Sequence, residues 1–195
     1  WQSRPPIHTR PGAHVRSIST PSAISGGPAI AATPDGRLAV AWDTYRNGSF
    51  DIYLREFLVG PEGAPEPAGP PMPVAAGVER QAHATIAADG QGRVWLAWDV
   101  SMEDWGKHPQ VGGTLHANRR TEVACYAGGR LLRPAADFMQ SLPKPFGKFA
   151  EYPQIAVDGN WPSPPCLCSV MCVGAAGDDS PSDGDGSLRS IWWGT

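Results

Sequence analysis

The chain has 195 residues, a formal net charge of −3 and 18% charged residues. This balance leaves no basic footprint for nucleic acid, so we expect no nucleic-acid partner. No apolar run approaches the ~20 residues that a transmembrane helix requires, so no membrane span is expected. The 23 glycines and 21 prolines instead predict many short turns.

One sequence pattern occurs twice and begins a third time. It runs from proline through Ile-Ala-Ala and Asp-Gly to Ala-Trp-Asp across residues 28–43, recurs in residues 84–99 and restarts in residues 153–160. The central isoleucine stands at Ile30, Ile86 and Ile155, so the steps are 56 and 69 residues. Repetition at such a period predicts a stacked or radial repeat architecture.

The first repeat has the pattern of antiparallel strands. An apolar run around Ile30 leads to Asp35-Gly36, a tight-turn signal because glycine supplies the positive φ that a hairpin needs. Residues 38–42 are apolar on both faces, as in a strand covered by neighbouring sheets on each side. A half-solvated strand over 50–57 and a short one near 72–76 follow, giving four strands, with Ile30 packed beside the inner one.

The second repeat follows the same plan. Its inner strand is predicted at 94–98 with Ile86 packed beside it, and its outer strands at 115–127 and 130–134. Gly128-Gly129 between the outer strands suits a two-residue hairpin turn. Four short antiparallel strands per repeat, without helical periodicity, favour an all-β fold of about two and a half propeller blades, an incomplete propeller.

These blades resemble those of secreted bacterial β-propellers with six or seven blades, the sialidase-like and TolB-like group. The resemblance rests on the P-x-I-A-x-D-G-x-(V/L)-x-(V/L)-A-W-D pattern within residues 15–160. It implies an extracytoplasmic location, periplasmic or secreted, and a chain that is a fragment of a larger protein. The Ser-x-Asp-x-Gly-x-x-Trp box typical of sialidase blades is absent from the sequence.

The repeat divides the chain into five expected parts. Residues 28–83 and 84–152 form two blades, and residues 153–160 start a third. Residues 1–27 are a lead-in that supplies the outer strand of a preceding blade. Residues 161–195, rich in Pro, Cys, Asp and Gly, are expected to be an irregular or disordered tail, and we hypothesise that they are an out-of-frame end.

Candidate ligand-binding residues cluster in the loops at one rim of the blades. In a four-stranded blade, the loop after the second strand shares a face with the connection into the next blade. Carboxylates, a guanidinium and an aromatic face at such a rim suit a polar ligand, a glycan or a peptide. The expected site residues are Asp43, Arg46, Glu79, Asp99, Trp105 and His108.

A structural role is the alternative for several of these residues. Asp43 and Asp99 are suited to binding backbone N–H groups of the loops. His83 and His108 lack the partner spacing of a zinc site, so no metal is expected, and no nucleotide or other cofactor motif occurs. No catalytic motif occurs in the sequence either, so no catalytic residues are assigned.

Three functions stay open at this point. We favour a non-catalytic propeller segment, a binding or scaffold module of a larger secreted bacterial protein whose partners include its remaining blades or domains. The second is part of a sialidase-like propeller glycoside hydrolase, which would need carboxylates, arginines and a tyrosine from several blades. The third is a purely structural repeat without a ligand.

Overall fold

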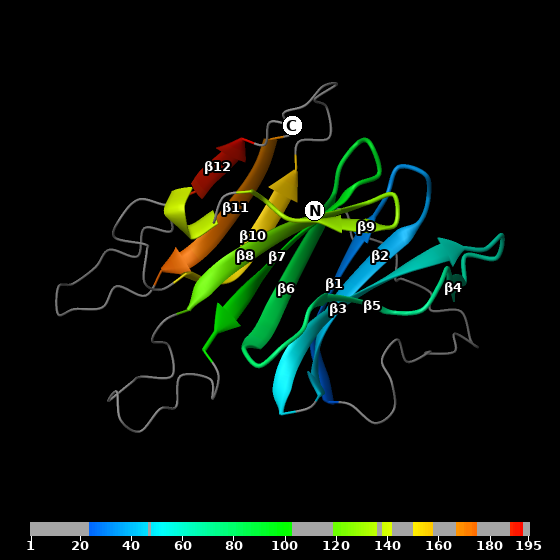
Figure 1. The fold of residues 1–195 in the computed structure, drawn as a ribbon. Helices are drawn as coiled ribbons and strands as arrows, with labels where there is room; N and C mark the ends of the chain where they lie inside the picture. The colour runs from blue at the N-terminus through cyan, green and yellow to red at the C-terminus, as the bar shows by residue number, and fades with distance from the viewer. Residues whose placement is uncertain are drawn as a thin grey trace, which may run out of the picture.

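The computed structural model describes residues 24–46, 48–102, 119–135, 138–141, 150–157, 167–174 and 188–192. Within these ranges the chain forms three antiparallel sheets and one short 3₁₀ helix, η2 (Phe138–Ser141). Figure 1 shows the sheets as successive layers, blue to cyan, green, and yellow to red. The all-β prediction is confirmed, and the layers match neighbouring blades of a partial propeller.

The first sheet has strand order β1-β2-β3-β4, and β5 also pairs with β3. The turn between β1 and β2 is the predicted one, with Gly36 at φ 83°. Two short strands share the outer edge of the long β3, and β4 had not been expected because it lies in a Pro/Gly-rich connection. The strands are β1 (Ile24–Ala32), β2 (Leu38–Arg46), β3 (Ser49–Val59), β4 (Pro65–Pro67) and β5 (Met72–Ala75).

The second sheet has the order β6-β7-β8-β9, and the third has the order β10-β11-β12. The hairpin at Gly128-Gly129 is present, with both glycines at positive φ. The expected outer strand over 115–127 is described only from Arg119, and β8 begins at Arg120. The strands are β6 (Arg80–Ala88), β7 (Val94–Ser101), β8 (Arg120–Ala127), β9 (Arg130–Leu132), β10 (Ala150–Val157), β11 (Leu167–Gly174) and β12 (Leu188–Trp192).

Residues 161–195 were expected to form an irregular tail, but two segments of this tail are strands of the third sheet. β11 and β12 both lie within residues 161–195, and β11 pairs with β10 in the register of the earlier repeats: Ile155 faces Val170 as Ile30 faces Val40. Cysteines and flanking prolines concealed the alternating apolar residues of this strand. The other residues of the tail lie outside the described ranges.

The sheets pack face to face, and the core lies between the first and the second. We call the front of the first sheet the face that carries Val40 and Trp42, and the front of the second sheet the face that carries Leu96 and Trp98; the back carries the alternate residues. Val94, Leu96 and Trp98 on the front of the second sheet are fully buried. They pack with residues on the back of the first sheet, namely Ala39, Ala41, Ile52, Leu54 and Val74. Both predicted inner strands are therefore buried.

Ile30 does not pack in the core, which corrects the sequence expectation. Its equivalent Ile86 is 8% exposed, whereas Ile30 is 64% exposed. The difference has a simple cause. The front of the second sheet lies against the first sheet, whereas none of the described strands covers the front of the first sheet around Ile30.

Candidate functional site

The first strand of each sheet is interrupted by a bulge at the same repeat position. The pairing register shifts between Gly26 and Ala29, between Ala82 and Thr85, and between Glu151 and Gln154. One residue of each bulge has a positive φ, and it stands three residues before the repeated isoleucine. These residues are Gly27 (φ 51°), His83 (φ 55°) and Tyr152 (φ 52°).

Two of these three residues carry side chains that rarely adopt such a backbone. A non-glycine residue in this region costs ~1–3 kcal/mol and tends to occur where the site needs its geometry. β6 contacts both β1 and β10, so the bulges of successive sheets are neighbours. The His83 and Tyr152 rings stack with centroids 4.2 Å apart and planes at 26°.

His83 also contacts the aspartate that ends the next strand. Its Nδ1 lies 2.7 Å from Oδ2 of Asp99, whose side chain is completely buried, while the His83 side chain is 27% exposed. An imidazole whose Nδ1–H donates to a buried carboxylate is held in one orientation, with Nε2 left for other contacts. The bulge therefore places a fixed, partly exposed ring above a buried acid.

The first sheet has the same bulge beside an aspartate, but glycine (Gly27) stands where the second sheet has His83. A Cβ at Gly27 would stand 3.0 Å from Oδ1 of Asp43, so the bulge approaches Asp43 as His83 approaches Asp99. Oδ1 of Asp43 and Oδ1 of Asp99 are both buried, and neither accepts a hydrogen bond from the described residues. Such acceptors cost ~1–3 kcal/mol each unless a donor reaches them.

Basic side chains balance the two carboxylates. Burial lowers the pKa of the Arg80 guanidinium, and the nearby charge of Arg119 lowers it further, whereas Asp99 and Asp43 act in the opposite direction. Arg80 begins β6, close to the bulge. We call Asp43, Arg80, His83, Asp99 and Tyr152 the inner-strand site, because they gather beside the first strands of the sheets.

The inner-strand site suits a ligand that offers hydrogen-bond donors and an apolar face. His83, whose side chain is 27% exposed, offers Nε2 as a hydrogen-bond acceptor, and Tyr152, which is 49% exposed, presents an aromatic surface. Arg80 and Arg119 neutralise the acids, so no strong single-sign field favours a charged ligand. A polar, uncharged molecule fits this chemistry best.

The structure brings together only part of the predicted site. Asp43 and Asp99 both lie at the inner-strand site. Arg46 lies over the ring of Tyr53, 4.8 Å from its centroid, on the front of the first sheet, whereas strand alternation places Asp43 on the back. Trp105 and His108 lie outside the described residues.

Glu79 holds an arginine of the neighbouring outer strand. Its two carboxylate oxygens accept hydrogen bonds of 2.8 and 2.7 Å from the guanidinium of Arg120. These bonds lower the pKa of Glu79 despite partial burial. Glu79 therefore joins the β5–β6 connection to β8, and its charge is already paired.

His83 and Tyr152 were not predicted as site residues. His83 has no neighbouring residue at the spacing of a metal ligand, so the sequence assigned it no role. The signal was present in the repeat itself: the position three residues before the isoleucine is Gly, His and Tyr in the three copies. A position that varies within an otherwise regular repeat is a candidate for recognition.

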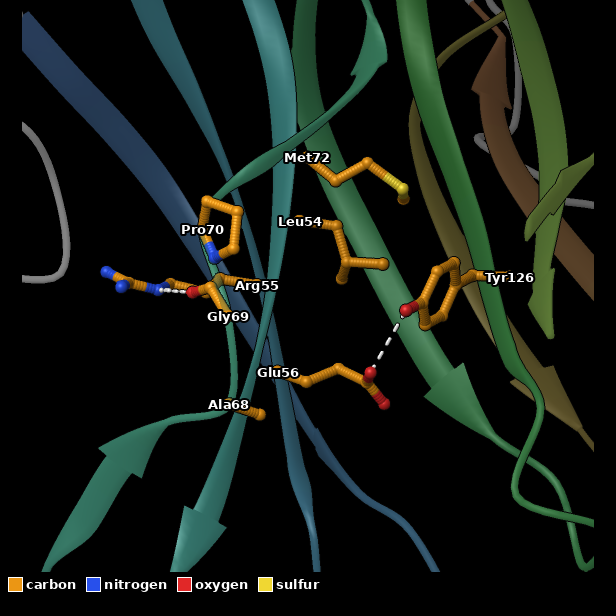
Figure 2. A pocket seen from close by; sticks show the side chains of 8 residues that line it. All are labelled: Leu54, Arg55, Glu56, Ala68, Gly69, Pro70, Met72 and Tyr126. Atoms are coloured by element: carbon orange, nitrogen blue, oxygen red, sulfur yellow. Dashed lines mark hydrogen bonds between the residues drawn. The ribbon is translucent and has the colours of Figure 1, made fainter. Parts of the chain in front are cut away.

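A second cleft, of about 190 Å³, lies between the outer parts of the first two sheets. Figure 2 shows Tyr126 of β8 reaching across it to Glu56 of β3, with Leu54 and Met72 beside them. The Tyr126 hydroxyl donates to Oε2 of Glu56 at 3.0 Å, and Arg37 donates to Oε1 at 2.6 Å. Because both oxygens of Glu56 are bonded, we interpret this cleft as a joint between sheets.

Neither a metal site nor a membrane helix emerges from the described residues. They contain no group of three or more His, Cys, Asp or Glu side chains placed to hold a metal ion. None of their helices is long and apolar enough to cross a membrane.

Comparisons with known proteins give distant structural neighbours and no match by sequence. No protein-family model and no curated protein matches the chain. Among solved structures, the chain is similar to Hadza microbial sialidase Hz136, with a TM-score of 0.49 and 10% sequence identity. The match covers 77% of this chain and 32% of that one, so the chain spans about a third of that protein's length. We base the function on the inner-strand site alone.

Proposed function

We propose that this chain is a non-catalytic carbohydrate-binding segment of a larger, propeller-type secreted bacterial protein, and that the inner-strand site binds an uncharged sugar. The observation that carries the proposal is the fully buried Asp99. One of its oxygens orients His83, and the other has no donor among the described residues. A ligand hydroxyl group can donate to Nε2 of the partly exposed His83 ring, which Asp99 holds in place.

Sugars supply the required chemistry in a compact form. Their hydroxyl groups donate to carboxylates, and the C–H face of a pyranose packs on an aromatic ring. Nε2 of His83, whose ring Asp99 orients, offers an acceptor, and the stacked rings of His83 and Tyr152 offer the surface. An extended peptide would bind mainly through main-chain pairing along a free strand edge, which this site does not need.

The larger protein enters the proposal because the site draws on more than one sheet. Asp43 comes from the first sheet, His83 and Asp99 from the second, and Tyr152 from the third. The remaining repeats or domains are the partners that we expect for the chain. A rigid scaffold of stacked sheets holds residues that are distant in sequence in one place.

The test begins with a screen of the full chain against neutral and acidic glycans, followed by calorimetric titration of the best neutral sugar. Asp99→Asn keeps the size of the side chain but removes its charge. We expect it to weaken binding by about tenfold or more, since the hydrogen bond from His83 to this charged group, which contributes ~1.5–3 kcal/mol, orients the ring that the ligand contacts.

Two matched variants separate binding from folding. Asp51→Asn alters another buried aspartate, one that accepts a hydrogen bond from the Gly77 amide away from the site, and should leave the affinity unchanged. Tyr152→Ala should weaken binding, whereas Tyr53→Ala, on the opposite face of the first sheet, should not. Equal affinities of Asp99→Asn and the unaltered chain would contradict the proposal.

The same preparation tests the hydrolase alternative. Chromogenic glycosides are incubated with the chain and with Asp99→Asn. Turnover that disappears in Asp99→Asn would replace the binding role with glycoside hydrolysis, whereas binding without turnover supports the role proposed above.

A further inference from the structure

Two aromatic rings lie beyond the inner-strand site, at the end of the β2–β3 hairpin. Tyr45 follows Asp43 by two positions in β2, so it lies on the same face of the first sheet, about 7 Å farther along the strand. Phe50 pairs with Tyr45 across the hairpin, and their rings meet edge to face with centroids 5.2 Å apart. Tyr45 is 37% exposed. We call Tyr45 and Phe50 the hairpin pair.

Arg80 links the hairpin pair to the inner-strand site. Its guanidinium carbon lies 5.6 Å from the centroid of the Phe50 ring. The same guanidinium interacts electrostatically with Asp99, Asp43 and Tyr152, the residues around the His83 ring. One cation therefore stands between an aromatic surface of the first sheet and an aromatic surface of the third.

A hydrogen bond to the backbone holds the hairpin next to Arg80. The hydroxyl group of Ser49, at the start of β3, donates to the carbonyl oxygen of Glu79 at 2.8 Å. Ser49 is buried, and Glu79 directly precedes Arg80 in the chain. The hairpin pair is thus positioned relative to the inner-strand site before any ligand arrives, which lowers the entropic cost of binding across both.

The repeat shows that the ring of Tyr45 is not required by the fold at this position. A shift of 56 residues carries Tyr45 onto Ser101, a small and buried residue that pairs with Arg80. The two sheets keep the same strand pairing with very different side chains here. A position that varies within a regular repeat is a candidate for recognition, and this one adjoins the variable position of His83 and Tyr152.

We propose that the hairpin pair is a second sugar subsite, so that the ligand is an uncharged oligosaccharide of at least two units. This inference rests on the proposed function of the inner-strand site. One unit lies on Tyr152 beside His83, and the next lies on Tyr45. A sugar chain presents a C–H face at each unit, so it can cover two aromatic surfaces that a single unit cannot.

Arg80 favours a sugar chain over an apolar ligand between the two surfaces. A guanidinium group carries N–H donors and no acceptor. Hydroxyl and glycosidic oxygens supply acceptors along the whole length of an oligosaccharide. An apolar ligand of the same length would cover the cation without offering it a hydrogen bond, which costs free energy.

The test compares single sugars with their disaccharides by calorimetric titration of the full chain. The probes are glucose, mannose and xylose, and the corresponding cellobiose, mannobiose and xylobiose. We expect a disaccharide to bind about fivefold or more tightly than its monosaccharide, the scale for one added aromatic contact. Tyr45→Ala should remove this advantage. Tyr45→Phe keeps the ring and should retain it, as should Tyr53→Ala on the opposite face of the sheet.

NMR of the unaltered chain with the bound disaccharide gives a readout that needs no variant. We expect nuclear Overhauser effects from the Tyr45 ring protons to one sugar unit and from the Tyr152 ring protons to the other. Effects from both rings to the same unit, or none from Tyr45, would overturn the proposal even if Tyr45→Ala failed to fold.

The outcomes separate this proposal from the proposed function. A monosaccharide that binds as tightly as its disaccharide, or a disaccharide advantage that survives Tyr45→Ala, contradicts the second subsite and leaves sugar binding at the inner-strand site intact. Monosaccharide binding that is equal in Asp99→Asn and the unaltered chain contradicts the proposed function instead. If none of these probes binds, the second subsite is rejected, and the wider glycan screen decides the proposed function separately.

Discussion

At the residue scale, one backbone position explains both the strain and the chemistry of the inner-strand site. Gly27, His83 and Tyr152 share a positive φ at the bulge of their strands. The bulge brings this residue against the aspartate at the end of the neighbouring strand, Asp43 in the first sheet and Asp99 in the second. In the third sheet the equivalent pairing position is Val173, so Tyr152 stacks on His83 without an aspartate in that position.

Gly27→Ala should destabilise the chain by ~1–3 kcal/mol. The new Cβ would require a positive φ that alanine disfavours, and it would stand 3.0 Å from Oδ1 of Asp43. Urea unfolding measures the change. At the neighbouring bulge, His83→Gly should be more stable than His83→Ala by ~1 kcal/mol for the same backbone reason. The reverse order would contradict the bulge geometry.

Asp89 gives the chain a pH-dependent contribution to stability. Burial raises the pKa of its carboxyl group, but hydrogen bonds from Trp95, Arg93 and Gln91 outweigh burial and hold the pKa below its ordinary value of 3.8. The stabilisation is therefore complete above that value and is lost as the pH falls through the folded-state pKa.

Asp89→Asn should lower the free energy of unfolding by ~1.5–3 kcal/mol at pH 7, the range for hydrogen bonds to a charged group. The difference from the unaltered chain should shrink below about pH 3.8, where the carboxylate loses its advantage. Urea titrations at pH 7, 5, 4 and 3 measure it. A difference that stays constant across this range would rule out the proposed charge contribution.

At the element scale, the second strands of the sheets carry most of the packing. Every residue of β7 is buried, and Trp98 donates from its indole nitrogen to Oε1 of Gln81 at 2.8 Å. The first two sheets are also joined at their outer parts by Tyr126 with Glu56 and by Arg133 with the carbonyl oxygen of Val74. These contacts surround the apolar interface with polar bonds.

Trp98→Ala should cost ~3–5 kcal/mol, because it empties a fully buried position between two sheets. Trp98→Phe should cost less, since it keeps most of the packing while leaving Gln81 without its donor. Thermal and urea unfolding compare both with Tyr45→Ala, at a 37% exposed residue near the end of β2. A loss from Trp98→Ala no larger than that from Tyr45→Ala would contradict the stacked-sheet interface.

The sequence predicts those strands whose burial on both faces requires a continuous run of apolar residues. Residues 38–42 and 94–98 are apolar on both faces because sheets cover both, and this composition is visible without a structure. β11 escaped prediction because its pairing follows from the register of β10, not from an Ala-Trp-Asp ending. The contact of His83 with Tyr152 escaped for a related reason: residue type does not reveal a positive φ, and the two rings meet only when sheets stack.

At the scale of the whole molecule, the three sheets stack so that their first strands lie side by side. β6 contacts β1 on one side and β10 on the other, and Figure 1 shows the three sheets as successive layers. The inner-strand site exists only because of this order, since its residues come from all three sheets. The central claim is therefore that the bulges of neighbouring sheets meet.

The nuclear Overhauser effect between the His83 and Tyr152 rings tests that claim most directly. In the isotope-labelled full chain, ring centroids 4.2 Å apart predict strong cross-peaks between the imidazole protons and the tyrosine ring protons. Asp99→Asn, which keeps a hydrogen-bond acceptor for His83, should preserve these cross-peaks. A well-dispersed spectrum with both rings assigned and no cross-peak between them would contradict the stacking of the second and third sheets and, with it, the inner-strand site.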